Sequence, residues 1–283
     1  MSPLETSAPF GARLRHAMDT RGPLCVGIDP HASLLTAWGL NDDITGLERF
    51  TRAVVEALAD RVAVLKPQSA FFERFGSRGI AVLEKAVEES RAAGALVLMD
   101  AKRGDIGSTM GAYAEAYLRK DSPLFSDAVT VSPYLGFGSL RPALDQAVIN
   151  GCGIFVLALT SNPEGAEVQR ATAAGGVSLA QLMLNHMADE NAGADPMGSV
   201  GAVVGATLGE AGVDLDINGP LLAPGIGAQG ATPADLPGVF GPAVRNVVPS
   251  VSRGVLRHGP DAAALREAAA RFSDEVRAAV DGA

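Results

Sequence analysis

Two carboxylates and a lysine stand close together in the hexapeptide DAKRGD at positions 100–105. A short apolar run at positions 95–99 leads directly into it and ends in charge, as is typical of a buried strand. Because alternate residues of a strand share a face, Asp100 and Lys102 are expected to point the same way. Charges at the exit of a strand rarely serve packing, so we expect this segment to carry chemistry.

The charge pattern restricts what that chemistry can be. A lysine flanked by carboxylates in a cleft stays protonated and keeps those carboxylates ionised. This argues against a Schiff-base aldolase, which needs a lysine with a depressed pKa in an apolar or cationic setting. Lys102 is better suited to be a fixed cation that stabilises a developing carbanion and then protonates it.

Two further charged residues extend this cluster, although each also has a simpler interpretation. Lys66 ends an apolar run, and Pro67 after it keeps the strand extended to its end. Taken alone, Lys66 could be a surface lysine with its ammonium group in water. Asp105 could merely cap the helix that follows it. Considered together with Asp100 and Lys102, Asp105 is better explained as part of a site, whereas both interpretations of Lys66 stay open at this point.

The elements that position these residues follow a repeating pattern. Short apolar runs alternate with longer segments of helical period, which predicts a parallel sheet. The expected strands are Leu24–Ile28, Val62–Lys66, Ala95–Lys102, Ala128–Val131, Gly153–Leu159, Ser199–Val204, Leu221–Ala223 and Asn246–Val251. The expected helices are Leu47–Ala59, Ile80–Ala93, Ile106–Arg119, Leu140–Ile149, Val177–Asn191 and Ala262–Val280.

About eight β/α units in a chain of 283 residues predict the α/β fold class. We expect a single (β/α)8 TIM barrel with an N-terminal extension, one domain over residues 1–283 with its core at about 24–256. Residues 189–198 are expected to form a surface loop. Nearly every expected strand ends in a polar or special residue, and in a barrel these ends converge on the face where active sites lie.

Residues 222–230 (LAPGIGAQG) contain the spacing G-x-G-x-x-G, which is also found in dinucleotide sites. The context does not fit a dinucleotide, because the strand before it is short and broken by Pro224, and the next strand does not end in an acid. A glycine-rich loop after the seventh strand and the loop after the eighth form the common phosphate site of barrels. Arg253 ends the eighth expected strand, so a phosphate site is predicted there.

Composition narrows the class of protein further. The formal charge of −9, from 23 Lys and Arg against 32 Asp and Glu, disfavours nucleic acid as a general partner. Cys25 and Cys152 are expected to be reduced core thiols, with a disulfide between them as the alternative. The sequence shows neither a signal peptide nor an apolar stretch of membrane-spanning length, so we expect no membrane association and a cytoplasmic protein.

Taken together, these motifs resemble the orotidine 5′-monophosphate decarboxylase family, and within it the bacterial group that carries DAKRGDI. The resemblance runs from about Leu24 to Arg253. The motifs are VGIDP around Asp29, LKPQSAFFE around Lys66, MDAKRGDIGST around Lys102, LTSNPEG around Ser161, APGIGAQG around Gln229 and SVSRG around Arg253. All six occur in order, each at the end of an expected strand.

The resemblance implies a carboxy-lyase that needs no cofactor and no metal. It would convert orotidine 5′-monophosphate to uridine 5′-monophosphate and CO2 through a C6 carbanion, the last step of de novo pyrimidine biosynthesis. The implied catalytic network is Lys66, Asp100, Lys102 and Asp105. Lys102 would be the proton donor to C6, and Asp105 would serve the site of the other subunit in a homodimer.

The resemblance also implies a set of substrate contacts. Asp29 would bind the ribose hydroxyls and Lys66, Thr109 would reach the ribose across the dimer interface, and Ser161 would recognise the pyrimidine edge. The other contacts would lie in the loops after the seventh and eighth strands, around the phosphate: Pro224, Gln229, Arg253 and Gly254. The loops after Ser161 and Pro224 would close over the substrate.

Two other functions remain open at this point. A sister enzyme acting on a sugar phosphate would share the D-x-K-x-x-D strand but would use Mg²⁺, and a non-catalytic sensor would bind a phosphate ligand without turnover. The histidines lack metal-like spacing and are expected at the surface or in caps, with His31 near the mouth of the site: His16, His31, His186 and His258. Trp38, Phe71 and Phe72 are expected to pack.

Overall fold

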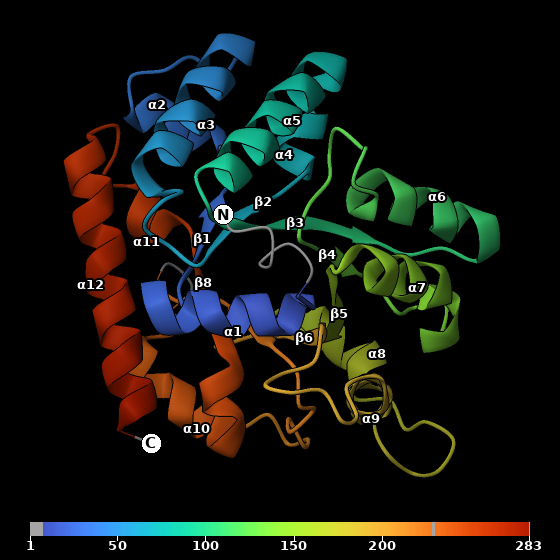
Figure 1. Ribbon diagram of the computed structural model, residues 1–283. Helices are drawn as coiled ribbons and strands as arrows, with labels where there is room; N and C mark the ends of the chain where they lie inside the picture. Colours follow the sequence, from blue (N-terminus) through green and yellow to red (C-terminus); the bar gives the residue numbers. More distant parts are fainter. Residues whose placement is uncertain (1–7, 228–229, 283) are drawn as a thin grey trace.

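A computed structural model describes residues 8–227 and 230–282 of the chain. Its strands are parallel and close into a barrel in chain order (Figure 1). They are β1 (Cys25–Ile28), β2 (Val64–Pro67), β3 (Leu96–Arg103), β4 (Ala128–Val131), β5 (Gly153–Leu159), β6 (Val200–Val204), β7 (Leu221–Pro224) and β8 (Val247–Val251). The expected α/β barrel is therefore confirmed, and each expected strand overlaps one of these.

Helices surround the barrel on its outside (Figure 1). The longer ones are α1 (Phe10–Arg21), α3 (Ile44–Leu58), α5 (Gly76–Ala92), α6 (Gly107–Leu118), α7 (Arg141–Asn150), α9 (Leu179–Glu190) and α12 (Ala262–Asp281). The short α-helices are α2 (Ala32–Ala37), α4 (Ala70–Glu73), α8 (Ala166–Gln169), α10 (Leu236–Phe240) and α11 (Arg253–Leu256). Short 3-10 turns are η1 (Phe137–Leu140), η2 (Pro163–Gly165), η3 (Pro233–Asp235) and η4 (Gly241–Asn246).

Alternation along the strands divides the core into two parts. One set of strand residues points outward, where it packs against the helices. The alternate set fills the barrel interior: Cys25, Val64, Leu96, Leu98, Ala128, Phe155, Val203, Leu222 and Val248. A parallel barrel buries both faces of every strand, which explains why its strands are nearly continuous apolar runs in the sequence.

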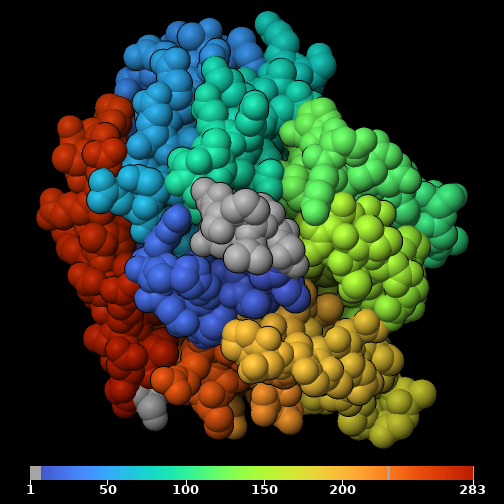
Figure 2. Space-filling view, in the orientation of Figure 1, coloured from blue at the N-terminus to red at the C-terminus, as the bar shows by residue number. Residues whose placement is uncertain are grey.

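Helix α1, which precedes the first strand, covers the end of the barrel where the strands begin. Its residues Phe10, Leu14 and Met18 join the interior cluster, and the ring of Phe10 meets that of Phe155 edge-on at 6.0 Å. Figures 1 and 2 show this helix, in blue, lying across the middle of the face in view. The expected N-terminal extension is thus a lid over the bottom of the barrel.

A buried carboxylate fixes α1 in this place. Asp127, just before β4, accepts hydrogen bonds from Arg13 of α1 at 2.6 Å, from Arg91 of α5 at 3.3 Å and from the backbone of Val97 at 2.9 Å. Arg13 also donates to the carbonyl of Gly151 at 2.8 Å. This cluster, Arg13–Asp127–Arg91, is called the bottom cluster below.

Some sequence-based expectations need correction. The loop expected at 189–198 begins later, because α9 continues to Glu190. Asn191 in that loop is buried, and its side-chain amide donates to the carbonyls of Val200 at 2.7 Å and Ile217 at 2.9 Å. These bonds fix the start of the loop against β6, so that part of the segment is not a surface excursion.

The remaining general expectations have mixed outcomes. Cys25 and Cys152 are both buried and free, so the disulfide alternative is wrong. Trp38 packs on Phe50 with ring centroids 4.3 Å apart, and Phe72 is fully buried. Within the described residues, no helix has the length and apolar character that crossing a membrane requires. The extent of the domain, 1–283 with a core at about 24–256, stays a prediction.

Candidate active site

Three charged side chains from two neighbouring strands are linked by hydrogen bonds at the C-terminal end of the barrel. The buried carboxylate of Asp100 accepts a hydrogen bond from Lys66 Nζ at 3.0 Å on Oδ2 and from Lys102 Nζ at 2.6 Å on Oδ1. The side chain of Lys66 is only 7% exposed, whereas that of Lys102 is 44% exposed. This Lys66–Asp100–Lys102 group, called the top cluster below, therefore presents one ammonium group to solvent.

The charges of the top cluster stabilise one another. Burial is the largest single influence on the pKa of both Lys66 and Asp100 and opposes their ionisation, but the neighbouring charges and hydrogen bonds together exceed it. The pKa of Lys66 is raised above its usual value, because Asp100 and Asp29 outweigh the effect of burial. The pKa of Asp100 is held well below its usual range, because Lys66 and Lys102 outweigh the effect of burial. Lys66 and Asp100 are thus ionised at neutral pH.

The backbone of β3 is irregular where it carries these residues. Pairing with β4 shifts register between Met99 and Arg103, and Lys102 adopts a φ of 49° in the left-handed region. The side chains of Asp100 and Lys102 do meet, as expected, but simple strand alternation does not place them. A bulge brings them together instead.

The top cluster lies in a cavity of about 430 Å³ at the C-terminal end of the strands. Among the residues predicted to form the site, those that line this cavity are Asp29, Lys66, Asp100, Lys102, Ser161, Pro224 and Arg253. These residues lie on or shortly after six of the eight strands, β1, β2, β3, β5, β7 and β8, so the expected convergence on one pocket is observed. Asp105, Thr109 and Gly254 do not line it, and Gln229 lies outside the described residues.

Asp29, directly after β1, provides an acceptor that faces the cavity. It is buried, and its Oδ1 has no hydrogen-bond partner among the described residues. A side chain at Gly27 would place its Cβ 2.8 Å from the other oxygen of Asp29, so only glycine leaves this carboxylate its place. A buried carboxylate oxygen without a partner is costly unless a ligand donates to it.

A basic group faces the same cavity from the loop after β8. Arg253 is exposed, and no ion pair links it to any residue within 8–227 and 230–282. Ser252 beside it has a buried hydroxyl with no hydrogen-bond partner in that same part of the chain. Gly225, after β7, also lines the cavity here. These groups can bind the anionic end of a ligand by donating hydrogen bonds to it.

Gly254 has a packing role in this structure. It is buried in α11, and an added Cβ would lie 3.0 Å from the ring of Phe272 in α12. The residue therefore allows α11 to approach α12 closely. Gly254 also follows Arg253 directly in the chain. Its role as a backbone donor to a ligand stays a prediction.

Asp105 and Thr109 lie on the outer rim of the barrel, away from the cavity lining. Asp105 Oδ1 accepts from the backbone of Ile106 at 2.8 Å. It is not a helix cap, because α6 begins at Gly107 and its N-cap position, Ile106, has no side-chain cap bond. The interpretation of Asp105 as an N-cap is therefore wrong.

Several cavity residues were not predicted from the sequence. Thr130 of β4 donates to Asp100 Oδ1 at 2.9 Å, and Phe71 lines the cavity where plain packing was expected. His31 lies against Phe71 with ring centroids 4.3 Å apart, which agrees with its expected place near the mouth. The one signal in the sequence for Thr130 is that it is a polar residue inside an apolar run, and such residues are common in strands.

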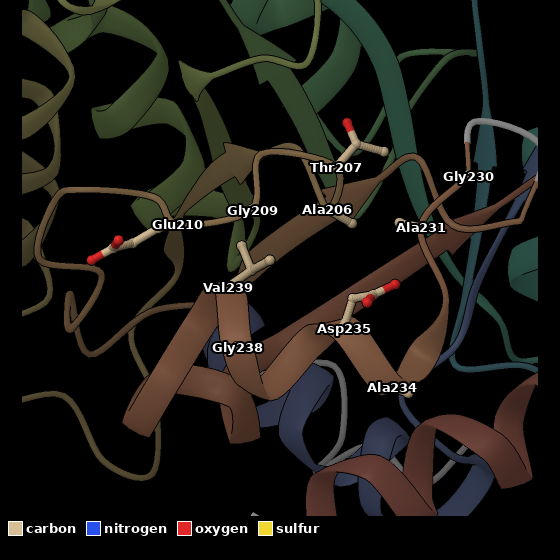
Figure 3. A pocket seen from close by; sticks show the side chains of 10 residues that line it. All are labelled: Ala206, Thr207, Gly209, Glu210, Gly230, Ala231, Ala234, Asp235, Gly238 and Val239. Atoms are coloured by element: carbon tan, nitrogen blue, oxygen red, sulfur yellow. The ribbon is translucent and has the colours of Figure 1, made fainter.

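A second hollow, of about 750 Å³, lies outside the barrel between the segment after β6 and α10 (Figure 3). Its charged lining residues are Glu210 and Asp235, both negative. Asp235 is engaged in capping η3 through Thr232. Because no described residue of its lining has a positive side chain, this hollow is a poor site for a phosphate ligand. Within the described part of the chain, no group of three or more His, Cys, Asp and Glu side chains could hold a metal ion.

Comparison with known proteins gives a consistent result. Residues 22–268 match the model of the orotidine 5′-phosphate decarboxylase / HUMPS family. The orotidine 5′-phosphate decarboxylase of Streptomyces coelicolor is 76% identical over 273 residues, 96% of this chain and 98% of that protein. Its counterpart from Salinispora arenicola is 65% identical over 274 residues, covering 96% and 99% of the two chains.

Solved structures are similar over the same extent. A crystal structure from Streptomyces avermitilis, named provisionally as an orotidine 5′-phosphate decarboxylase, has a TM-score of 0.96 at 75% identity and covers 98% of this chain and 97% of its own. The OMP decarboxylase of Leishmania donovani has a TM-score of 0.75 at 28% identity, with 96% and 99% covered. The similarity therefore includes the whole barrel.

Proposed function

The chain belongs to the orotidine 5′-phosphate decarboxylase / HUMPS family, and from this premise we propose that it converts orotidine 5′-monophosphate to uridine 5′-monophosphate and CO2. The names of its near-full-length relatives favour this reaction over the sugar-phosphate chemistry of a sister enzyme. The observation that carries the proposal is the top cluster, which faces a cavity whose other charged groups suit a ribose and a phosphate.

Lys102 performs the central step in this proposal. Loss of CO2 from C6 of the pyrimidine leaves an electron pair in the plane of the ring, where the ring π-system cannot delocalise it. A cation fixed beside that carbon stabilises the pair in the transition state. The ammonium group of Lys102 is held at 2.6 Å from Asp100 and is partly open to the cavity, so it is placed to supply both this charge and the proton that C6 then receives.

Asp100 and Lys66 fix the position of this donor. Because Asp100 accepts from a lysine on each carboxylate oxygen, an ammonium group that turned away would leave one oxygen of this buried carboxylate without its lysine. Because these bonds are made by residues of the protein itself, they hold the ammonium group in place without a contribution from substrate, which lowers the reorganisation cost of the reaction. Lys66 in turn is attracted by Asp29, whose unpartnered oxygen is the proposed acceptor for ribose hydroxyls.

The remaining substrate contacts are assigned by class of chemistry. Arg253 binds the phosphate through its guanidinium fork, with Gln229 from the loop after β7 as a further donor. Ser161, after β5, recognises the polar edge of the pyrimidine. Since the phosphate is remote from the bond that breaks, its binding energy serves orientation and closure of the loops after Ser161 and Pro224.

A homodimer completes the site in this proposal. Asp105 and Thr109 lie off the cavity of their own chain, and exposed apolar residues stand at the same rim: Ile106 at 62%, Tyr134 at 76% and Leu135 at 52% exposure. The two loops that carry these residues are adjacent, because Ser132 donates its backbone N–H to the carbonyl of Arg103 at 2.8 Å. Contact between two such rims would cover the apolar patch and bring Asp105 to the partner's cavity.

Subunit mixing tests the dimer. An Asp105→Asn variant and an Asp29→Asn variant, each inactive alone, should regain about one quarter of wild-type activity when their subunits exchange, because half of the dimers are hybrids with one intact site. Light scattering should give twice the chain mass. Absence of recovered activity after demonstrated exchange would contradict a shared site.

The proposal places the enzyme in the cytoplasm. Cys25 and Cys152 are free, and burial raises the pKa of each thiol to about 12, which keeps both in the unreactive protonated form. Free thiols in the core are typical of reducing compartments. Cell fractionation checks this point, and recovery of the protein in a secreted fraction would contradict it.

Turnover of the substrate tests the proposed reaction. Purified protein should consume orotidine 5′-monophosphate, followed by the change in ultraviolet absorbance, and should release CO2 in equal amount. Activity should persist after treatment with a chelator, which separates this enzyme from a Mg²⁺-dependent sister enzyme. Nucleotide binding without turnover would instead favour a sensor.

A further inference from the structure

We infer that Thr130 is a positioning residue that holds the ammonium group of Lys102 at its place of action. Thr130 lies on β4, is buried and does not bear a charge. The inference rests on the proposed role of Lys102 as the cation and proton donor at C6. It adds a residue whose hydroxyl acts on the shape of β3 and on the orientation of Asp100.

The hydroxyl of Thr130 uses its full hydrogen-bonding capacity within the site. It donates its proton to Asp100 Oδ1 at 2.9 Å. It accepts the backbone N–H groups of Ala101 and Lys102, each at 3.0 Å. A hydroxyl offers one donor and two acceptor lone pairs, so all three are engaged with β3. The contact is directed at the residues that carry the chemistry.

The two backbone bonds explain the irregularity of β3. In a regular strand successive N–H groups point to opposite sides, so two of them cannot converge on one acceptor. They converge here because Lys102 has a φ of 49° and the register with β4 shifts between Met99 and Arg103. Such a backbone persists in a residue other than glycine only where the surroundings hold it, and the Thr130 hydroxyl is the group that does so.

The bond to Asp100 sets the direction of the carboxylate. Oδ1 receives both Thr130 and Lys102, while Oδ2 receives Lys66. Without the hydroxyl, the carboxylate could rotate toward a single lysine, and the bulge could relax toward a regular strand. Either change would move Lys102 Nζ away from the reacting carbon. A displacement of about 1 Å at such a centre is enough to lower a rate by roughly 100-fold.

Three substitutions test this role. Thr130→Val keeps the shape of the side chain and removes the hydroxyl, and Thr130→Ser keeps the hydroxyl. Thr51→Val is the matched control, because Thr51 on α3 is equally buried but its hydroxyl has no hydrogen-bond partner among the described residues. Wild-type turnover of orotidine 5′-monophosphate is measured first, so that failure of the proposed function is seen separately.

We expect Thr130→Val to lower kcat by about 10- to 100-fold while the Kd for uridine 5′-monophosphate changes less than about threefold, since the phosphate and ribose contacts are intact. Thr130→Ser should retain most of the wild-type kcat, and Thr51→Val should retain all of it. Equal losses of kcat and of nucleotide affinity in Thr130→Val, or a kcat close to wild type, would overturn the inference.

A second pair keeps the test decisive if Thr130→Val does not fold. Thr130→Ala adds no bulk against the two N–H groups, so its fold can be compared directly with that of Thr130→Ser by circular dichroism and Tm. A kcat at least about tenfold higher for serine than for alanine supports the hydroxyl as the positioning group. Equal kcat values in the two folded variants would show that Thr130 contributes only packing.

Discussion

The two ends of this barrel carry similar charge clusters, each with one carboxylate and two cations, that have different roles. At the top, Asp100 is bound by Lys66 and Lys102; at the bottom, Asp127 is bound by Arg13 and Arg91. In both, a buried carboxylate accepts from two cations and from one further donor. The number and sign of the charges do not distinguish the two clusters.

The surroundings separate the two clusters. The bottom cluster is covered by α1, and each of its arginines has a second contact. Arg13 donates to the carbonyl of Gly151, and Arg91 lies over the ring of Phe125 at 4.3 Å. The top cluster opens to a cavity, and its outer cation is a lysine on a left-handed backbone position. The guanidinium group of arginine stays charged and suits a structural ion pair, whereas the ammonium group of lysine can release a proton. A charge cluster is therefore interpreted by what it faces and by which cation it uses.

The largest expected effect breaks the top cluster. Lys102→Ala should lower kcat by about 1,000-fold or more, because the charge and the proton at C6 are both lost. The Kd for uridine 5′-monophosphate should change little, since other groups hold the ribose and phosphate. Steady-state kinetics and calorimetry measure the two quantities. A near-normal kcat would refute the assignment of the proton donor.

The matching change at the bottom should affect stability and leave chemistry alone. Asp127→Asn removes the charge that pairs Arg13 and Arg91, and we expect a loss of about 3 kcal/mol in the free energy of unfolding. The kcat of the folded variant should stay within about threefold of wild type. Urea unfolding and kinetics at a temperature well below the Tm provide the measurements. If kcat fell as strongly as stability, the two ends would not be independent.

A third test compares two arginines. Arg253→Ala should lower kcat/KM for the phosphorylated substrate by about 100-fold while barely changing kcat/KM for the bare nucleoside, because only the former has a phosphate to lose contact with. Its unfolding free energy should be unchanged, since Arg253 has no ion pair within the described part of the chain. Arg13→Ala serves as the control with the opposite pattern. Equal kinetic losses for both substrates would exclude phosphate contact by Arg253.

The smallest expected effect is the loss at low pH of the stability that Asp100 contributes. The pKa of Asp100 is lowered in the folded protein, so its ion pairs contribute stability above the unfolded value of about 3.9, and this contribution is lost as pH falls below it. The difference in unfolding free energy between wild type and Asp100→Asn should therefore shrink by about 1.4 kcal/mol per pH unit below 3.9. Denaturant unfolding at several pH values checks this. A constant difference would show that Asp100 is not ionised in the folded state.

The sequence predicted most of the top of the barrel because the relevant signal is local. Lys66, Asp100 and Lys102 each end an apolar run, and that position is sufficient to place them together once a barrel is assumed. Thr130 gave no such signal, since it lies inside an apolar run that fits an ordinary strand. Its importance depends on a bulge in the neighbouring strand, which no residue pattern in β4 records.

The bottom of the barrel was largely hidden from sequence analysis. Asp127 follows a serine in what looks like a loop, and its partners come from segments about 36 and 114 positions away. Helix α1 was expected only as an extension. Its apolar residues pack against the open end of the barrel, and this contact cannot be recognised before the barrel is known. Asp105 and Thr109 do not line the cavity of their own chain, so their proposed role in a partner's site has no counterpart in the geometry of a single chain.

The lid formed by α1 also bears on how the chain is made. This helix leaves the ribosome before any strand, yet the interior cluster it joins includes Val248 of the last strand. The complete docking site for its apolar face, with Phe10 and Leu14, therefore exists only once the last strand of the barrel has been made. Until then the nascent chain has a hydrophobic surface that a chaperone can bind.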